Sequence, residues 1–136
     1  MIVAIASFKA REGADDEEVE RTFERMRELV SQIPGFVSYK NYVAEDGEEL
    51  EIARFESEPA LEGWRLHPEH MEAQRRGRDE FFEEYWVQVC AVIRQYRFVR
   101  GTGYSADMPW SARATMPRGQ LAGEQPNDRQ RDHRTC

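Results

Sequence analysis

Apolar and polar residues follow regular patterns along the first 100 residues, and each pattern has the period of one kind of secondary structure. Residues 2–9 are mostly apolar or β-branched and predict a strand. Apolar residues then recur at steps of three and four, which predicts an amphipathic helix. Asp15 or Asp16 can cap its start, and Pro34-Gly35 ends it. The apolar stripe of this helix comprises Val19, Phe23, Met26, Val30 and Ile33.

A β-hairpin is predicted next. Residues 36–44 are rich in Phe, Val and Tyr and read as a strand, and residues 50–55 alternate as a returning strand does. Asp46-Gly47 lies between them, and this pair favours a tight turn with positive φ angles. The hairpin therefore places the two strands side by side in one sheet.

Two short helices and a long last strand complete this part of the chain. Ser57 can cap a helix that carries Trp64, and Pro68 suits the first turn of a second helix better than a helix interior. The second helix is expected to run as far as Phe82, weakened at Gly77. Residues 85–99 read as the last strand.

This order, β-α-β-β-α-β, predicts an α+β, ferredoxin-like antiparallel sheet with helices on one face. Both sides of the last strand are apolar, for example Trp86 and Cys90 on one side and Val87 and Val89 on the other. A sheet covered on one face only should show one polar side. We therefore expect a homodimer that covers the second face with a partner sheet. The alternatives are a central position for this strand or cover by the chain's own C-terminal segment.

Composition divides the chain near residue 100. Residues 1–100 carry a net charge of −8, whereas residues 101–136 carry +1 and contain no Ile, Val or Phe. Such a segment cannot bury enough apolar area to offset its ordering entropy. We expect one domain over residues 1–100 and a polar, disordered tail over residues 101–136.

Charge and cysteine content exclude several classes of protein. The net charge of −7 is unfavourable for binding nucleic acid or an anionic membrane. No apolar run approaches the roughly 20 residues that span a bilayer, and the apolar N-terminus lacks the basic start of a signal peptide. Cys90 and Cys136 cannot form a disulfide framework, so a reduced, cytoplasmic setting is expected.

The residues that could carry chemistry cluster at the junction of the two short helices. His70, Gln74 and Arg78 are spaced by four and would share one helix face, with Trp64 and His67 nearby. A histidine near neutral pKa can carry a proton, and an indole offers a flat wall to an aromatic ligand. Trp64 and His70 are the predicted catalytic residues, and His67, Gln74 and Arg78 the predicted substrate contacts.

Each of these residues also has an ordinary structural explanation. His67 could only cap the second helix, His70 could be hydrogen-bonded at the surface, and Trp64 could belong to the core. No metal site is expected, because the two histidines are three residues apart and lack a second ligand cluster. Cys90 lies in an apolar strand and is expected to be inert.

The element order and the segment from Trp64 through His67-Pro68-Glu69-His70 resemble the antibiotic biosynthesis monooxygenase domain. This family belongs to the dimeric α/β-barrel superfamily. The similarity covers about residues 1–100 and continues through Ala73-Gln74, Gly77-Arg78, Phe82, Tyr85, Val89 and Arg94-Gln95-Tyr96.

The resemblance implies a small monooxygenase that oxidises an electron-rich aromatic or polyketide-like compound with O2 and needs no cofactor. An alternative within the family is haem degradation, for which an Asn on the first strand and a His about ten residues after the Trp are typical. Ser7 and Gln74 stand at those positions here. A third possibility is a binding or assembly module, or a non-oxidative cyclase, of the same fold.

Overall fold

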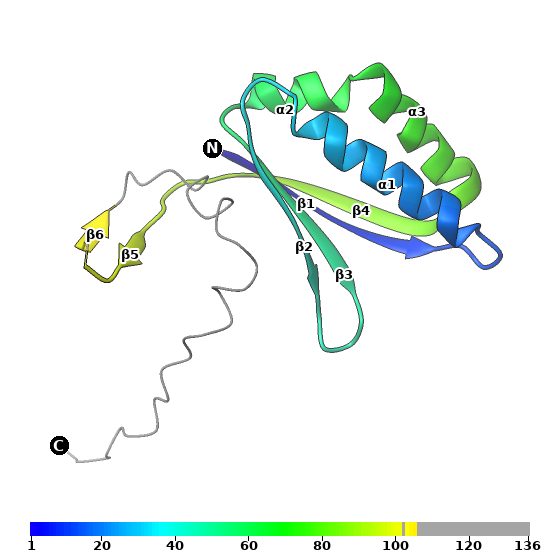
Figure 1. The fold of residues 1–136 in the computed structure, drawn as a ribbon, viewed down its shortest axis with the longest axis horizontal. Helices are drawn as coiled ribbons and strands as arrows, with labels where there is room; N and C mark the ends of the chain where they lie inside the picture. The colour runs from blue at the N-terminus through cyan, green and yellow to red at the C-terminus, as the bar shows by residue number, and fades with distance from the viewer. Residues whose placement is uncertain (102, 106–136) are drawn as a thin grey trace, which may run out of the picture.

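The computed structural model describes residues 1–101 and 103–105 of the 136-residue chain. Most of the described elements build one layer of strands and one layer of helices (Figure 1). In chain order the elements are β1 (Ile2–Ala10), α1 (Asp16–Val30), β2 (Phe36–Val43), β3 (Glu49–Phe55), α2 (Glu58–Arg65), α3 (Pro68–Arg76), the π-helical turn η1 (Gly77–Phe81), β4 (Phe82–Ala91), β5 (Arg97–Val99) and β6 (Gly103–Ser105).

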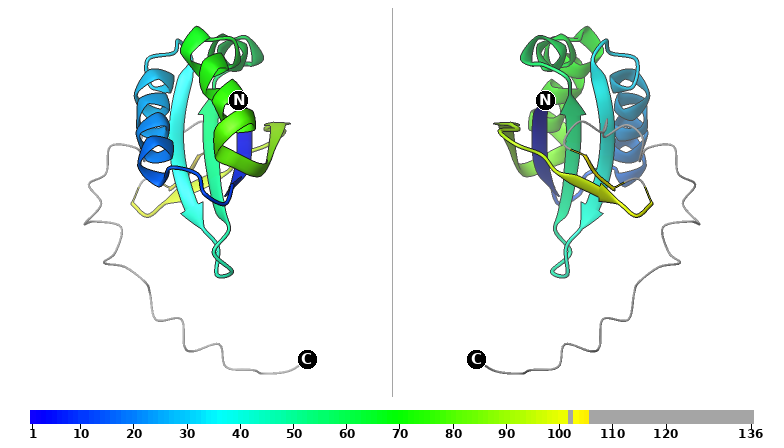
Figure 2. Two further views of the ribbon diagram at one scale, coloured as in Figure 1. Left: turned by 90° about the vertical axis from the view of Figure 1, so that its right-hand side faces the viewer. Right: turned by 90° about the vertical axis from the view of Figure 1, so that its left-hand side faces the viewer.

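The main sheet has the strand order β2-β3-β1-β4, and all neighbouring strands are antiparallel. Helices α1, α2 and α3 cover the same face of this sheet (Figures 1 and 2). The predicted ferredoxin-like α+β fold is confirmed. Its core lies between the two layers, where Leu29, Val30, Phe55 and Trp64 are buried against one another.

Local signals in the sequence define the ends of the helices. The side chain of Asp15 accepts hydrogen bonds from the backbone N–H groups of Glu17 and Glu18, which caps α1. Gly35 has φ +84°, and a Cβ at this position would lie 2.6 Å from the Cβ of Ala60. Only glycine therefore fits the turn that leads into β2.

The hairpin between β2 and β3 is present, but its loop is wider than the predicted tight turn. The Ala44 N–H donates to the Glu48 carbonyl at 2.8 Å. Gly47 has φ +90°, whereas Asp46 has a negative φ. One glycine rather than an Asp-Gly pair with two positive φ angles thus reverses the chain.

The last strand is shorter than predicted and lies at an edge of the sheet. Strand β4 ends at Ala91, which pairs with Ile2, the first residue of β1. One further hydrogen bond, from the Val92 N–H to the Met1 carbonyl at 3.0 Å, follows this pair. The prediction of one strand over residues 85–99 is therefore wrong, and so is the alternative of a central position for this strand.

Strand β5 pairs instead with β6, and this small hairpin crosses the predicted boundary at residue 100. Residues 103–105 are thus strand, although the composition predicts a disordered tail from residue 101. The rest of the predicted tail, residues 106–136, lies outside the described part of the chain.

The second face of the main sheet is strongly apolar. Cross-strand pairing places Leu50 and Trp86 beside Ser7 on this face, and Ile52 beside Ile5. Trp86 is 37% exposed, and among the described residues no helix packs on this side. We call this surface the open face. The expected partner sheet would cover it.

Candidate functional site

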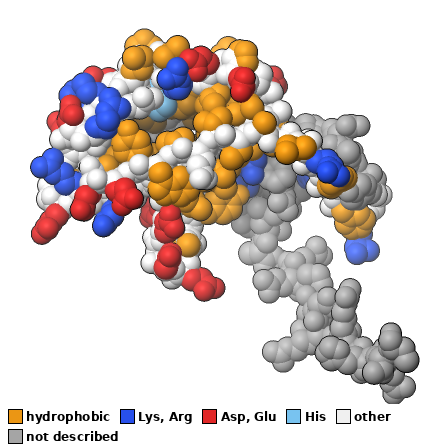
Figure 3. Space-filling model, turned by 180° about the vertical axis from the view of Figure 1, so that it is seen from behind, with side chains coloured by type: hydrophobic (Ala, Val, Ile, Leu, Met, Phe, Trp, Pro, Cys, Tyr) orange, Lys and Arg blue, Asp and Glu red, His pale blue; other side chains and the backbone are white. Residues whose placement is uncertain are grey.

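A cavity of about 340 Å³ lies between the sheet and the helices. The sheet forms the floor of this cavity and presents small side chains to it. Ala4 and Ala53 are direct cross-strand neighbours there, and Ala6 follows on the same face. Alanine side chains leave space that larger residues would fill. This volume is in the range of small-molecule sites, about 300–1,000 Å³. Figure 3 shows hydrophobic side chains gathered around a hollow with a histidine inside it.

Trp64 joins the cavity to the core. The Ser57 side chain accepts a hydrogen bond from the Ala60 N–H and so starts α2 at the position that turns Trp64 inward. The indole is 9% exposed and packs with Leu29, Val30 and Phe55, yet it also lines the cavity. The predicted core role and the predicted aromatic wall are thus combined in one side chain.

His70 lies against this indole. The two rings are stacked, with centroids 3.9 Å apart and planes inclined by 12°. His70 Nδ1 lies 3.0 Å from the carbonyl oxygen of Trp64. A carbonyl oxygen only accepts, so Nδ1 carries the proton and donates it, and in the neutral ring Nε2 holds the free lone pair. Among the described residues, Nε2 has no hydrogen-bond partner.

Burial keeps His70 neutral. Desolvation lowers the pKa of His70 below its usual value of 6.5, and the charge of His67 acts in the same direction. The hydrogen bond to the Trp64 carbonyl opposes this shift because it stabilises the charged ring. His70 is therefore a neutral imidazole at pH 7, with a hydrogen-bond acceptor beside an apolar cavity.

The structure brings three of the five predicted site residues together. Trp64, His70 and Gln74 all line the cavity. The Gln74 amide nitrogen lies 3.2 Å from His70 Nδ1 and 3.3 Å from the Arg65 carbonyl oxygen. Since Nδ1 already carries a proton, the amide donates to the Arg65 carbonyl.

The other two predicted residues lie outside the cavity lining. His67 caps α3, where its Nδ1 accepts a hydrogen bond from the Glu69 N–H at 3.2 Å. Arg78 is exposed, because α3 ends at Arg76 and the chain continues in the π-helical turn η1. The wider turn breaks the spacing of four that would place Arg78 below Gln74. Gly77 begins this turn, and a Cβ there would lie 3.0 Å from the Phe82 ring.

Several polar residues that the sequence reading did not assign to the site also line the cavity, among them Arg27, Tyr39 and Glu51. The Tyr39 hydroxyl donates to Asn41 Oδ1 at 2.9 Å, and Tyr39 is also hydrogen-bonded to the side chains of Arg27 and Glu51. Burial raises the pKa of Glu51 above its usual value of 4.5. In an alternating strand, Glu51 lies on the same face as the apolar Phe55. This position in the sequence pattern could have predicted that Glu51 faces the cavity.

The cations of the cavity lining have acidic partners. Arg27 Nη2 lies 3.3 Å from Glu20 Oε1, and the guanidinium of Arg65 forms two hydrogen bonds with the Glu62 carboxylate. The cavity therefore presents little net positive charge to a ligand.

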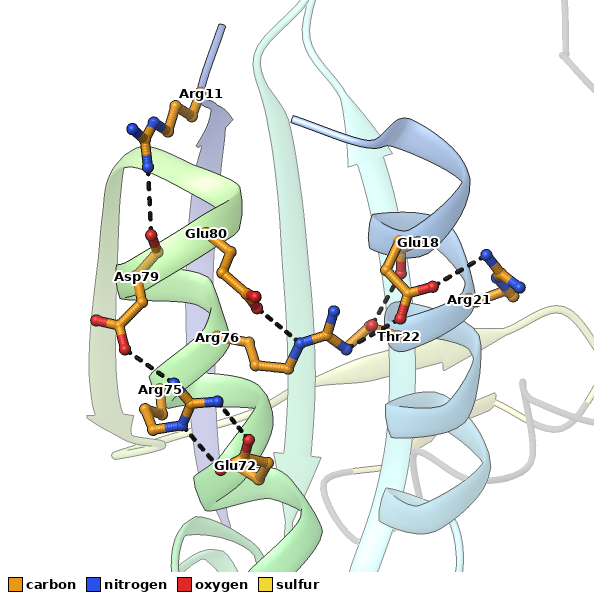
Figure 4. A network of polar contacts seen from close by, with 9 residues as sticks. All are labelled: Arg11, Glu18, Arg21, Thr22, Glu72, Arg75, Arg76, Asp79 and Glu80. Carbon is orange, nitrogen blue, oxygen red and sulfur yellow. Dashed lines mark hydrogen bonds and ion pairs between the residues drawn. The ribbon is translucent and has the colours of Figure 1, made fainter. Parts of the chain in front are cut away.

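Ion pairs join α1 to α3 on the outer surface of the helix layer (Figure 4). Arg76 donates to Glu18 on α1 at 3.0 Å and to Glu80 at 2.8 Å. Arg25 of α1 binds both oxygens of Glu69 at 3.1 Å. Exposed pairs of this kind contribute little to stability, because water and salt screen the attraction between the charges. They fix the relative position of two helices whose inner sides form the cavity wall.

The residues that a haem-degrading relative would need do not fit here. Ser7 shares the open face with its cross-strand neighbours Leu50 and Trp86, so its side chain points away from the cavity. Gln74 lines the cavity but has no imidazole to bind iron. In the described part of the chain, no three His, Cys, Asp or Glu side chains are placed to hold a metal ion. No helix within residues 1–101 and 103–105 is long and apolar enough to cross a membrane.

Comparison with known proteins agrees with this architecture. A protein of Bacillus subtilis (strain 168), the uncharacterized YqjZ, is 33% identical over 95 residues, which cover 70% of this chain and 83% of YqjZ. SnoaB, a cofactor-independent oxygenase from Streptomyces nogalater, superposes with a TM-score of 0.56 at 16% identity, over 69% of this chain and 94% of SnoaB. A dimeric ferredoxin-like protein of unknown function from Thermobifida fusca gives a TM-score of 0.54 at 19% identity, over 67% and 90% of the two chains.

At these identities the two solved structures show a shared fold only. The family assignment comes from the sequence, because residues 1–76 match the profile of the family described as antibiotic biosynthesis monooxygenase. The matched segment contains β1, the β2-β3 hairpin, the helices α1, α2 and α3, and the cavity residues Trp64, His70 and Gln74. The chain belongs to the antibiotic biosynthesis monooxygenase family.

Proposed function

We propose that the protein is a cofactor-independent oxygenase that oxidises a hydroxylated aromatic compound with O2. The observation that carries this proposal is the state of His70, a neutral imidazole stacked on Trp64 with Nδ1 bound to a carbonyl and Nε2 unoccupied by protein. A hydroxyl group of an aromatic ligand can donate to Nε2. The indole supplies a flat surface on which such a ring can pack.

The oxidation needs electrons, and an electron-rich substrate can supply them itself. When a ring CH2 group becomes a ketone, the carbon loses two hydrogens and gains one oxygen atom of O2, and the other oxygen atom leaves as water. Proton transfer from the ring hydroxyl to His70 Nε2 would make the substrate anion that reacts with O2. The stacked indole and the Trp64 carbonyl both stabilise the imidazolium formed in this step.

The rest of the cavity suits this chemistry because it is mainly apolar. Phe8, Phe23 and Phe82 pack together at the cavity wall, with ring centroids 4.9 to 5.9 Å apart. Exclusion of water strengthens the hydrogen bond from substrate to His70 and protects a reactive anion. Gln74 positions the loop between the helices through its bond to the Arg65 carbonyl.

The functional unit of the proposal is a homodimer. Trp86 on the open face of β4 is 37% exposed, and the neighbouring strands place Leu50 and Ile52 on the same face. A partner sheet packed on the open face would bury that apolar surface. Sedimentation velocity at micromolar concentration should give the mass of two chains, and a monomer would contradict this part of the proposal.

Oxygen-dependent product formation tests the activity directly. The purified protein is incubated with a panel of hydroxylated naphthalenes and anthrones, in air and under nitrogen, while quinone absorbance and O2 consumption are recorded. We expect quinone only in air, above the rate without protein. Absence of oxygen-dependent turnover across the panel would contradict the proposal and favour a binding module. A haem titration is run in parallel, and a Soret shift abolished by His70→Ala would favour haem degradation instead.

A further inference from the structure

The proposed chemistry uses the helix side of the cavity and leaves a second polar group without a role. We define the sheet-side cluster as Glu51, Tyr39 and Asn41. Glu51 on β3 pairs directly with Asn41 on β2, and Tyr39 pairs with Ala53, so all three side chains lie on the face that the helices cover. Glu51 and Tyr39 line the same cavity as His70.

The Tyr39 hydroxyl connects Asn41 and Glu51 within the cluster. The Tyr39 hydroxyl has one proton, which it donates to Asn41 Oδ1 at 2.9 Å. Its oxygen can then accept a hydrogen bond, and a protonated Glu51 can supply it. An ionised Glu51 can only accept a hydrogen bond, so the Tyr39 hydroxyl would have to donate to Glu51 instead of to Asn41.

Burial of the carboxyl group favours its neutral form. It raises the pKa of Glu51, as do the charges of Glu49 on β3 and Glu20 on α1. Tyr39 on β2 and Arg27 on α1 act in the opposite direction but do not cancel the shift. Arg27 is itself paired with Glu20 at 3.3 Å, which limits its effect on Glu51.

A carboxyl group in this place is costly to the fold. The floor of the cavity is otherwise built from Ala4, Ala6 and Ala53, and transfer of a polar group from water into apolar surroundings is unfavourable unless it is hydrogen-bonded. Tyr39 satisfies part of the hydrogen-bonding capacity of Glu51. The remainder is available to a molecule in the cavity.

We propose that Glu51, supported by Tyr39, is a specificity-determining residue that binds an uncharged oxygen substituent of the aromatic ligand, at the opposite wall from His70. A carboxyl group accepts a hydrogen bond from a ring hydroxyl group in either protonation state, and it can also donate one when protonated. The ligand class is then an aromatic compound with two oxygen substituents, one for each wall. This inference rests on the proposed function only in that the cavity receives an aromatic ligand.

The test compares two probes that differ by one hydroxyl group. Dissociation constants of 2,6-dihydroxynaphthalene and 2-naphthol are measured by calorimetry under nitrogen for the wild type, Glu51→Gln, Glu51→Leu and the control Glu48→Gln in the exposed hairpin loop. We expect the wild type and the control to bind the dihydroxy probe about tenfold more tightly, since one hydrogen bond contributes about that factor. Glu51→Gln should keep the preference because an amide also donates and accepts.

Glu51→Leu should lose the preference, so that the two dissociation constants become equal while 2-naphthol still binds as in the wild type. Unchanged binding of 2-naphthol also shows that this variant is folded. A preference retained in Glu51→Leu, no preference in the wild type, or no binding of either probe would overturn the inference. Because oxygen is absent, failure of the oxidation does not affect these results. If the protein oxidises its substrate in air but shows no binding preference that depends on Glu51, the inference is overturned and the proposed function stands.

Discussion

His70 on the helix wall and Glu51 on the sheet floor of the cavity are both shielded from water, and burial shifts their pKa values in opposite directions. On the helix wall, burial lowers the pKa of His70 and so favours its neutral form. On the sheet floor, burial raises the pKa of Glu51 and so also favours the neutral form. The general rule is that a poorly hydrated site disfavours charge of either sign. His70 is thus neutral at pH 7, and Glu51 resists ionisation more than an exposed glutamate does.

The two walls also differ in how their polar groups are held. His70 is fixed by a backbone carbonyl and by an indole that belongs to the core. Glu51 is held through side chains, Tyr39 above all, which themselves have further partners. We therefore expect the helix wall to be the more rigid of the two, and the sheet floor to respond more readily to pH and ligand.

The largest expected effect concerns the anchor of the helix wall. Trp64→Ala removes a side chain that is 9% exposed, and such a truncation costs about 3–5 kcal/mol of unfolding free energy. Trp64→Phe keeps part of the packing and should lose less. Urea denaturation followed by circular dichroism measures both, with Leu66→Ala, 49% exposed, as the control. Equal midpoints for Trp64→Ala and the control would show that the indole does not anchor this wall.

The next effect concerns catalysis at the same wall. His70→Gln removes the proton acceptor and should slow oxygen-dependent quinone formation by about 100- to 10,000-fold, the usual contribution of general base catalysis. His67→Asn serves as the matched control, because asparagine can still cap α3. Rates measured at substrate saturation separate this loss from weaker binding. Wild-type turnover in His70→Gln would remove His70 from the mechanism.

A smaller effect should appear on the sheet floor as a dependence of stability on pH. The pKa of Glu51 is raised in the folded state, so its contribution to stability is fully present below about pH 4.5 and is lost as pH rises through the folded-state pKa. Glu51→Gln cannot ionise. Its melting temperature should therefore increase relative to the wild type between pH 4 and pH 8.

The groups that face Glu51 are Tyr39, Arg27, Glu20 and Glu49, and none of them is changed in this comparison. Parallel melting curves for the wild type and Glu51→Gln across this range would mean that Glu51 ionises normally. The carboxyl group would then be well hydrated, and the contrast with His70 would disappear.

Much of the fold could be predicted from the sequence because its signals are local. The period of the stripe from Val19 to Ile33, the Asp15 cap and the Pro34-Gly35 stop all act within a few residues. The extent of the last strand depends instead on its pairing with β1, which is far away in the sequence, so the apolar run over residues 85–99 could not reveal that β4 ends at Ala91.

The candidate site shows the same division. Trp64, His70 and Gln74 could be predicted because they are close in sequence on two consecutive helices. Arg78 was placed by a helical period that the π-helical turn interrupts. Glu51 has the appearance of an ordinary solvated strand glutamate, and only the packing of Arg27 from α1 and Tyr39 from β2 against it creates a buried carboxyl group.

The most direct test of the account is the protonation state of His70 in solution. Long-range ¹H–¹⁵N spectra of the uniformly labelled protein, with His70→Gln to assign the ring, report which nitrogen carries the proton and how the ring titrates. We predict a neutral ring protonated on Nδ1 at pH 7, with a pKa below the usual 6.5. A pKa at or above 6.5, or a neutral ring protonated on Nε2, would contradict the proposed role of His70 as the proton acceptor of the cavity.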